Sequence, residues 1–199
     1  DKAVATMWVT EAFLEKYANI GQRYYLVQGY ETEFYEPAET VRTGANMSYT
    51  PHVPVQFVTI SKWCQSWLKE EYGQTARYAP NGLEPGQFAA KERAFDKEKV
   101  RILIEGDCGV YYKNVDESFR IVDLLDKDKY EIWYMSYNAK PKAHYRVDRF
   151  LHSVPYEQVA QVYGQCDILL KSSFLESFSY PPLEMMATGG CVVVAPNGG

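Results

Sequence analysis

Short apolar runs alternate with amphipathic segments along most of this chain. Runs rich in β-branched and aromatic residues predict strands at residues 3–9, 24–28, 56–60, 75–79, 100–104, 130–135, 146–151, 167–171 and 191–195. Segments with helical spacing predict helices at residues 11–18, 62–72, 115–125, 156–163 and 183–188, with Ser61 as the N-cap of the second. Strands that alternate with helices indicate βαβ units. We therefore expect an α/β chain with mostly parallel sheets that helices cover on both faces.

Two segments interrupt this alternation. Residues 31–54 have no clear period and contain three prolines, so we expect a loop with no more than one short helix. Residues 84–99 include Pro85-Gly86 and then mixed charges, as a linker or surface segment does. We place a domain boundary in this segment, which gives one domain at residues 1–98 and a second at residues 99–199.

The end of the chain carries the strongest chemical signal. The segment Glu176-Ser-Phe-Ser-Tyr-Pro-Pro-Leu-Glu184 places two carboxylates eight positions apart across a Pro-Pro helix start. A strand at residues 168–170 precedes it, and a helix that ends at Gly189-Gly190 follows it. A strand, a loop and a helix N-terminus in this order form an anion site, because unpaired backbone N–H groups and the helix dipole converge there. Carboxylates beside an anion site suit a ligand with both phosphates and hydroxyls, such as a nucleotide sugar.

Charge and composition exclude several classes of protein. The net charge of −5 argues against a general nucleic-acid or anionic-membrane surface. No apolar run approaches the roughly 20 residues of a membrane span, and the first residues have no signal-peptide pattern. The four cysteines are scattered without metal-binding spacing, so we expect free thiols in a reducing compartment.

With these residues identified, the chain resembles the retaining glycosyltransferases of family 4, which have the two-domain GT-B architecture. Residues 176–184 match that family's E-x7-E motif, including an aromatic residue two positions after the first Glu and a proline before the Leu-Glu pair. Residues 185–190 are similar to the family's small-residue helix and glycine stop.

Upstream segments add to the resemblance. Ile60-Ser-Lys-Trp63 resembles the family's serine-led helix start, and Pro80-Asn-Gly-Leu83 resembles the turn before the interdomain linker. Tyr25-Leu-Val-Gln-Gly-Tyr-Glu31, with Ala5-Thr-Met-Trp8 before it, is similar to the sub-branch that contains bacterial rhamnosyltransferases.

The resemblance covers nearly the whole chain but not the whole fold. Family members run to roughly twice this length, with two Rossmann-like domains that face a cleft. The resemblance therefore implies that residues 1–98 are the C-terminal part of an acceptor-side domain plus linker. Residues 99–199 would be the N-terminal part of the domain that binds the nucleotide-sugar donor. We expect the chain to be a central fragment that is inactive by itself.

The E-x7-E motif implies roles for both of its carboxylates. Glu176 would act as a catalytic residue that hydrogen-bonds the donor sugar, and Glu184 would hold the ribose hydroxyls through charge-assisted hydrogen bonds. The alternative is a solvated Glu176 and a Glu184 that complements the helix dipole from the first helical turn. Neither residue has an evident environment that would raise its pKa, so the pair does not resemble the carboxylates of a glycosidase.

The residues between the two carboxylates would bind the donor diphosphate. The resemblance implies that the backbone N–H groups of Phe178, Ser179 and Tyr180 face it. Ser177 and Ser179 stand where the family commonly has glycines. This departure is mild, because serine is small enough to leave the backbone close to the ligand.

A second donor loop follows the strand at residues 100–104. The family commonly has Gly-Arg in this loop and a lysine six residues after the arginine. This chain has Gly106-Asp107 and then Lys113 at the matching offset. Lys113 would neutralise the leaving diphosphate as a catalytic residue, the alternative being an ordinary surface lysine. Asp107 places a negative charge where a cation is expected, so that Lys171 or a residue outside the chain compensates, or the donor is held differently.

Two further positions complete the candidate site. Val154 follows a strand and would pack on the nucleobase through backbone groups. His152 stands nearby where small residues are common, and a catalytic role for it is a lesser alternative. Trp8 is a candidate for stacking on an acceptor sugar, with core or interface packing as the alternative.

The resemblance implies an enzyme that moves a hexose from a nucleotide-diphosphate sugar to a glycan or lipid-linked glycan with retained anomeric configuration. The sub-branch suggests rhamnose and bacterial polysaccharide biosynthesis. No catalytic triad and no DxD motif at a strand end are present in the sequence, so we expect no metal and no cofactor. We expect a cytoplasmic protein with association at the inner membrane face. The alternatives are a non-catalytic nucleotide-binding module, which Asp107 favours, and a GT-B epimerase or phosphorylase.

Overall fold

A computed structural model describes residues 1–90, 92–93 and 98–198, and the chain divides into two compact units. The first unit contains residues 1–82 and 175–178 with Gly198, and the second contains residues 83–174 and 179–197. The predicted linker at residues 84–99 includes residues 91 and 94–97, which lie outside the described residues. The assignment of residues 1–98 and 99–199 to an acceptor and a donor domain stays a prediction.

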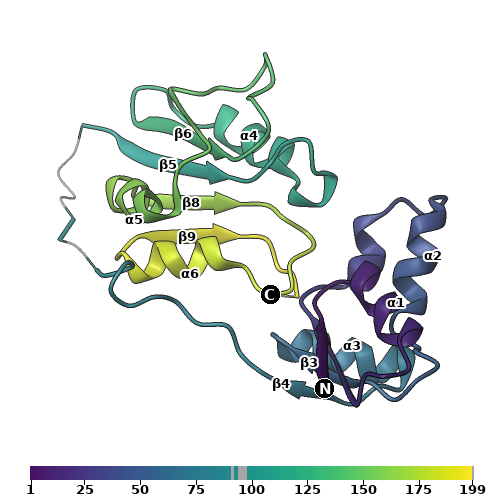
Figure 1. The fold of residues 1–199 in the computed structure, drawn as a ribbon. Helices are drawn as coiled ribbons and strands as arrows, with labels where there is room; N and C mark the ends of the chain where they lie inside the picture. The colour runs from purple at the N-terminus through teal and green to yellow at the C-terminus, as the bar shows by residue number, and fades with distance from the viewer. Residues whose placement is uncertain (91, 94–97, 199) are drawn as a thin grey trace. The chain divides into compact units, whose positions relative to one another are not determined.

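The first unit contains a four-stranded parallel sheet with the strand order β1-β2-β3-β4, of which Figure 1 labels β3 and β4. The strands are β1 Lys2–Ala5, β2 Gln22–Val27, β3 Gln56–Thr59 and β4 Ala76–Tyr78. The helices are α1 Trp8–Lys16, the 3-10 helix η1 Glu31–Phe34, α2 Thr40–Met47 and α3 Lys62–Tyr72. Its core includes Leu14, Tyr25, Phe57 and Leu68, so both strands and helices contribute apolar side chains.

Helices in the first unit account for two differences from the sequence prediction. The strand expected at residues 3–9 ends at Ala5, because α1 already begins at Trp8. The Thr10 hydroxyl accepts a hydrogen bond from the backbone N–H of Met7 at 3.2 Å and so stabilises this earlier helix start. Residues 31–54 contain both η1 and α2 rather than one short helix at most.

Helix α2 depends on contacts from outside its own sequence. The Arg42 guanidinium donates to the carbonyl oxygens of Thr32 and Tyr35 at 3.0 and 2.9 Å, which joins α2 to η1. Gly44 lies so close to Trp8 that a Cβ atom added there would be 2.8 Å from Cζ3 of the indole. Tertiary packing therefore supports a segment whose Thr and Gly residues have little helix propensity.

The second unit contains a five-stranded parallel sheet with the strand order β7-β6-β5-β8-β9 (Figure 1). The strands are β5 Val100–Glu105, β6 Tyr130–Ser136, β7 Arg149–His152, β8 Ile168–Lys171 and β9 Cys191–Val194. The helices are the 3-10 helix η2 Tyr111–Lys113, α4 Val115–Asp123, α5 Tyr156–Gln165 and α6 Tyr180–Ala187. The predicted α/β architecture with two parallel sheets is confirmed.

Alternate residues of the central strand β5 enter two separate apolar clusters. Leu103 packs in a cluster with Ala160 of α5 and Met185 of α6. Ile102 and Ile104 pack in a second cluster with residues of α4. Because successive side chains of a strand point to opposite faces, helices cover both faces of this sheet.

Helix α6 begins three residues before the predicted start at Leu183. Ser179 is its N-cap, and Pro181 and Pro182 lie within its first turn. Proline lacks a backbone N–H, and the first turn of a helix is the place where that N–H has no helical acceptor. The Pro-Pro pair is therefore part of the helix and does not merely precede it.

Candidate functional site

The order of strands in the second unit defines where a ligand site can form. From β5 the chain continues to β6 and β7 on one side of the sheet, and β8 and β9 then add to the other side. The strands β5 and β8 are neighbours, and the chain leaves their carboxyl ends toward opposite sides of the sheet. This is the topological switch point, where ligands of open α/β sheets bind.

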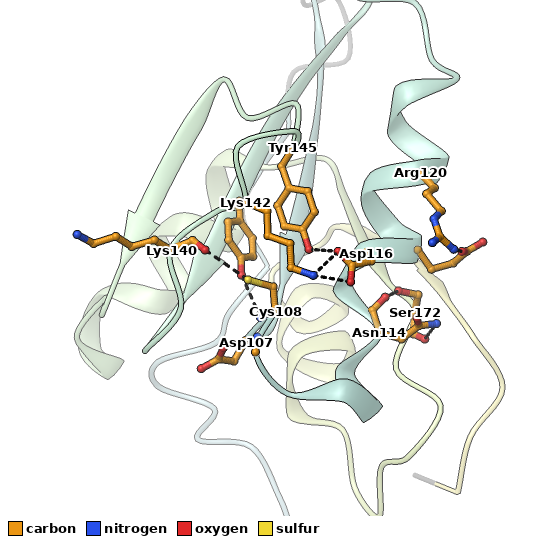
Figure 2. A network of polar contacts seen from close by, with 12 residues as sticks. Asp107, Cys108, Asn114, Asp116, Arg120, Lys140, Lys142, Tyr145 and Ser172 are labelled. Carbon is orange, nitrogen blue, oxygen red and sulfur yellow. Dashed lines mark hydrogen bonds and ion pairs between the residues drawn. The ribbon is translucent and has the colours of Figure 1, made fainter.

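Hydrogen bonds join these two loops. The Phe174 amide donates to the Tyr112 carbonyl at 3.1 Å, and the Asn114 side-chain amide donates to the Ser172 carbonyl at 3.2 Å. The hydroxyls of Ser118 and Ser172 lie 2.7 Å apart in a hydrogen bond. Figure 2 shows the pair of Asn114 and Ser172 at the start of α4. The loops after β5 and β8 are thus held as one edge of the unit.

Gly106 fixes the path of the loop after β5. Its φ of +139° is in a region that L side chains rarely adopt, and an added Cβ would lie 3.2 Å from Cγ2 of Val115. Its carbonyl accepts a hydrogen bond from the Tyr134 hydroxyl at 2.9 Å. A glycine at this position lets the backbone turn close to the start of α4.

Asp107, which stands where the family commonly has an arginine, has a local partner in the structure. Its Oδ1 accepts a hydrogen bond from the Gly109 amide at 2.9 Å, and its carbonyl accepts one from the Val110 amide at 3.0 Å. An aspartate that binds its own backbone two residues on stabilises a tight turn. The residue therefore shapes the loop in which an arginine was expected.

A second polar network fastens the neighbouring loop after β6 (Figure 2). The Asp116 carboxylate accepts two hydrogen bonds from Lys142, at 2.8 and 2.7 Å, and one from the Tyr145 hydroxyl. The Lys142 ammonium and then the Tyr145 hydroxyl lower the pKa of Asp116 below its ordinary value. The thiol of Cys108 donates to the Lys140 carbonyl at 3.3 Å, which links the same loop to the one after β5.

Lys113 lies at the end of η2, directly before α4. Its side chain is half-buried, and its Nζ lies 5.6 Å from the centre of the Tyr112 ring. The Ser173 hydroxyl bonds the Lys113 carbonyl at 3.4 Å, which attaches this residue to the loop after β8. The structure thus places Lys113 at the joined loops of the switch point.

Lys171 has a different environment, at the end of β8. Its side chain is only 3% exposed, and its Nζ donates to Oε2 of Glu105 at 2.7 Å. Glu105 ends the neighbouring strand β5, so the two side chains meet at the same edge of the sheet. The Glu105 carboxylate balances the charge of Lys171, which weakens the suggestion that Lys171 replaces a missing phosphate-binding cation.

Glu184 lies inside α6 rather than in its first turn, and it is 5% exposed. Burial raises the pKa of its carboxyl, a hydrogen bond from the Tyr163 hydroxyl opposes this rise, and the charge of Glu105 adds to it. The expectation that neither carboxylate of the motif has a pKa-raising environment is therefore wrong for Glu184. The earlier start of α6 explains the difference, because it moves Glu184 onto the buried side of the helix next to Met185.

The start of α6 offers few backbone donors. Pro181 and Pro182 have no N–H group, so the amides of Ser179 and Tyr180 are the donors at this helix end. The Oγ of Ser179 is buried, and it has no hydrogen-bond partner within residues 1–90, 92–93 and 98–198. A buried hydroxyl of this kind can bind a ligand oxygen.

The remaining predicted residues lie in different places. Val154 is half-buried after β7, where it packs on the cluster that contains Met185. Glu176, Ser177 and Phe178 fall in the segment 175–178, which groups with the first unit.

Trp8 lies in the first unit, at the start of α1. Its indole Nε1 donates to the Tyr35 hydroxyl at 2.9 Å, and its ring packs against Gly44. The exposed His152 has its ring centre 5.6 Å from that of Phe150. The contacts of Trp8 with Tyr35 and Gly44 fit the packing alternative for this residue, although Trp8 also lines a cavity.

Tyr163 and Glu105 were not found from the sequence. Glu105 carried a signal, since it directly follows the strand predicted at residues 100–104, and Lys171 ends the strand predicted at residues 167–171. Opposite charges at the same end of two parallel strands favour a pair. Tyr163 carried none, because only packing of α5 against α6 brings it to Glu184.

The described residues contain no group of three or more His, Cys, Asp or Glu side chains that could bind a metal ion. Within the same residues, no helix has the length and hydrophobicity needed to cross a membrane. The family model for glycosyl transferases group 1 matches residues 94–199. No curated protein matches the chain.

Proposed function

The chain belongs to the glycosyl transferases group 1 family, and we propose that it binds a nucleotide-diphosphate sugar at the switch point between β5 and β8. Membership in the family means a transferase that acts on a sugar donor and an acceptor. The observation that carries the more specific proposal is the buried Glu184 in α6, the helix that follows the loop after β8, hydrogen-bonded to Tyr163. A carboxylate held in this way is preorganised to accept a pair of ribose hydroxyls.

The other parts of the donor would lie along the loops after β5, β7 and β8. The N–H groups of Phe178, Ser179 and Tyr180 would bind the diphosphate, and the buried Oγ of Ser179 supports a ligand oxygen at this point. Gly106 would let the backbone approach the phosphates, and Val154 would contact the base. Glu176 would bind the hydroxyls of the donor sugar. The small side chain of Ser177 would let the loop backbone lie close to the donor.

We propose transfer with retention of anomeric configuration. The acceptor hydroxyl attacks the anomeric carbon on the face that the diphosphate leaves, and an oxygen of the departing phosphate takes the proton from the hydroxyl. Lys113 would stabilise the negative charge that develops on the leaving diphosphate. Because the donor supplies its own base, the reaction needs no nucleophile from the protein and no cofactor.

The proposal extends to the acceptor and the setting. The donor sugar would be a hexose, with rhamnose suggested by the segment around Tyr25, and the acceptor a glycan or lipid-linked glycan. The protein would act in bacterial polysaccharide biosynthesis in the cytoplasm, at the inner face of the membrane, with Trp8 on the acceptor side.

Asp107 supports a second candidate, a non-catalytic module that binds nucleotides. Its turn with Gly109 leaves a carboxylate where the family commonly has a cation, and Lys171 is already paired with Glu105. A domain with only Lys113 at the phosphates would bind a nucleotide and stabilise the leaving diphosphate poorly.

Donor turnover separates these two functions. The intact protein is incubated with UDP-, GDP-, ADP- and dTDP-linked hexoses. Proton NMR follows the released nucleotide and the anomeric configuration in which the released or transferred sugar first forms. A retaining transferase releases one nucleotide and gives a product with the anomeric configuration of the donor. Binding without release supports the second candidate, and a product of inverted configuration rejects the retaining mechanism.

Lys113→Ala tests the assigned cation in the same assay. We expect turnover to fall by on the order of tenfold to a hundredfold, because the diphosphate loses a charge partner. Lys129→Ala, at an exposed turn of the second unit, is the matched control and should leave turnover unchanged. Equal turnover in the two variants would reject the role of Lys113.

A further inference from the structure

A cavity of about 230 Å³ lies between α1 and α2 in the first unit, and none of the residues assigned to the donor is among those that line it. Trp8, Glu11 and Glu15 of α1 form one side of it, and Met47 of α2 lies on the other. His52, which follows α2, also lines it. The cavity therefore combines apolar side chains with two carboxylates.

Glu11 is the unusual residue in this wall. It is 3% exposed, and its Oε1 is buried with no hydrogen-bond partner in the part of the chain that the structure describes. A buried carboxylate oxygen without a donor is costly, because the protein does not replace the hydrogen bonds that water would supply. Burial, and then the charge of Glu15, raises the pKa of Glu11 to about 7.

The surroundings of Glu11 are already fixed in place. Oε1 of Glu15 accepts a hydrogen bond from the His52 amide at 2.6 Å. The Trp8 backbone amide donates to Glu31 at 2.6 Å, and its indole Nε1 donates to Tyr35. A ligand would therefore meet a preorganised wall, which lowers the cost of binding.

The charge of the wall selects the ligand. Among the described residues that line the cavity there is no Lys or Arg. Two carboxylates, those of Glu11 and Glu15, do line it. A positive ligand would gain Coulomb energy from both carboxylates in a site partly shielded from water. A neutral hydroxyl could donate one hydrogen bond to Glu11 but would gain little from Glu15.

We propose that this cavity binds a small organic cation, a primary ammonium group on a short apolar body, with the Glu11 carboxylate as its hydrogen-bond acceptor. The ammonium would lie between Glu11 and Glu15, and the apolar body would pack on Met47 and the indole of Trp8. This site is independent of the donor site and does not depend on the proposed transfer reaction.

The test compares two probes of equal size, n-butylammonium and 1-butanol, on the intact protein at pH 8. Saturation-transfer NMR measures binding of each probe, with sodium chloride added to match ionic strength. We expect n-butylammonium to bind at least tenfold more tightly than 1-butanol. Equal binding, or no binding of n-butylammonium, would overturn the proposal.

Variants locate the site. Glu11→Gln keeps the shape of the side chain and removes its charge, and should weaken n-butylammonium binding at least tenfold. Glu70→Gln removes an exposed carboxylate from α3, outside the cavity, and should leave binding unchanged. Circular dichroism establishes that each variant is folded. Equal affinities of the two folded variants would also overturn the proposal.

Discussion

Glu11 and Glu184 are buried carboxylates in helices, 3% and 5% exposed, but their partners differ. Glu184 receives a hydrogen bond from Tyr163, whereas Oε1 of Glu11 receives none from the residues that the structure describes. A buried carboxylate without a donor destabilises the folded state when it is ionised. The stability of the protein should therefore depend on the ionisation of Glu11.

Glu11→Gln should stabilise the protein above pH 7. The pKa of Glu11 is about 7 in the folded state against an ordinary value of 4.5, so the folded state binds this proton more tightly than the unfolded state. The wild-type protein then loses stability as the pH rises from 4.5 to 7, on the order of 3 kcal/mol from this group. Glutamine does not ionise, so the variant escapes that loss. Urea unfolding at pH 4.5, 6 and 8 measures the difference.

The difference between variant and wild type isolates Glu11, because its neighbours Glu15 and His52 are the same in both proteins. Tyr25, which also faces Glu11, has its pKa raised by burial and stays protonated throughout. Glu70→Gln is the control and should show no added stability at pH 8. The difference in unfolding free energy between Glu11→Gln and the wild type should be larger at pH 8 than at pH 4.5. An equal difference at the two pH values would contradict the burial of an unpaired Glu11 carboxylate.

The sequence identified Glu184 as a candidate but not its surroundings. A motif names a residue through its spacing, and spacing carries no information about which other helix packs beside it. Tyr163 therefore could not be found, because α5 reaches Glu184 only in the folded unit. Asp107 was identified as a departure, yet its turn with Gly109 required coordinates.

At the scale of elements, the loop between β5 and α4 depends on Gly106. Gly106→Ala should destabilise the protein by about 1–3 kcal/mol, because alanine is strained at this positive φ and its Cβ would press on Val115. Thermal or urea unfolding measures the loss. Gly82→Ala is the matched control, since an added Cβ there meets nothing within 4 Å, and it should be nearly neutral. Equal effects of the two substitutions would mean that the backbone at Gly106 is not held as described.

Elements with their own local signals were predicted well. The hydroxyl of Ser61 caps α3 by accepting a hydrogen bond from the Cys64 amide at 3.1 Å, as its position before an amphipathic run predicted. The sequence allowed one short helix within residues 31–54 but did not locate α2, which is held by Arg42 and by the contact of Gly44 with Trp8. The start of α6 was placed too late because prolines also fit a first helical turn.

At the scale of the whole molecule, the alternation of strands and helices was sufficient to predict the fold class. Parallel sheets follow from that alternation, because crossover connections need a helix between neighbouring strands. The strand order did not follow, and it is the order β7-β6-β5-β8-β9 that creates the switch point. The family match to residues 94–199 adds that this unit belongs to a glycosyltransferase.

The most direct test of the account is nucleotide binding at that switch point. Thermal unfolding of the intact protein is measured with UDP, GDP, ADP or dTDP, beside Glu184→Ala and the matched control Glu117→Ala from the exposed side of α4. A nucleotide at 100 times its dissociation constant should stabilise the protein by about 2.7 kcal/mol. We expect one nucleotide to give this shift in the wild type and in Glu117→Ala, and not in Glu184→Ala. A shift that persists in Glu184→Ala, or no shift with any nucleotide, would contradict the proposed donor site.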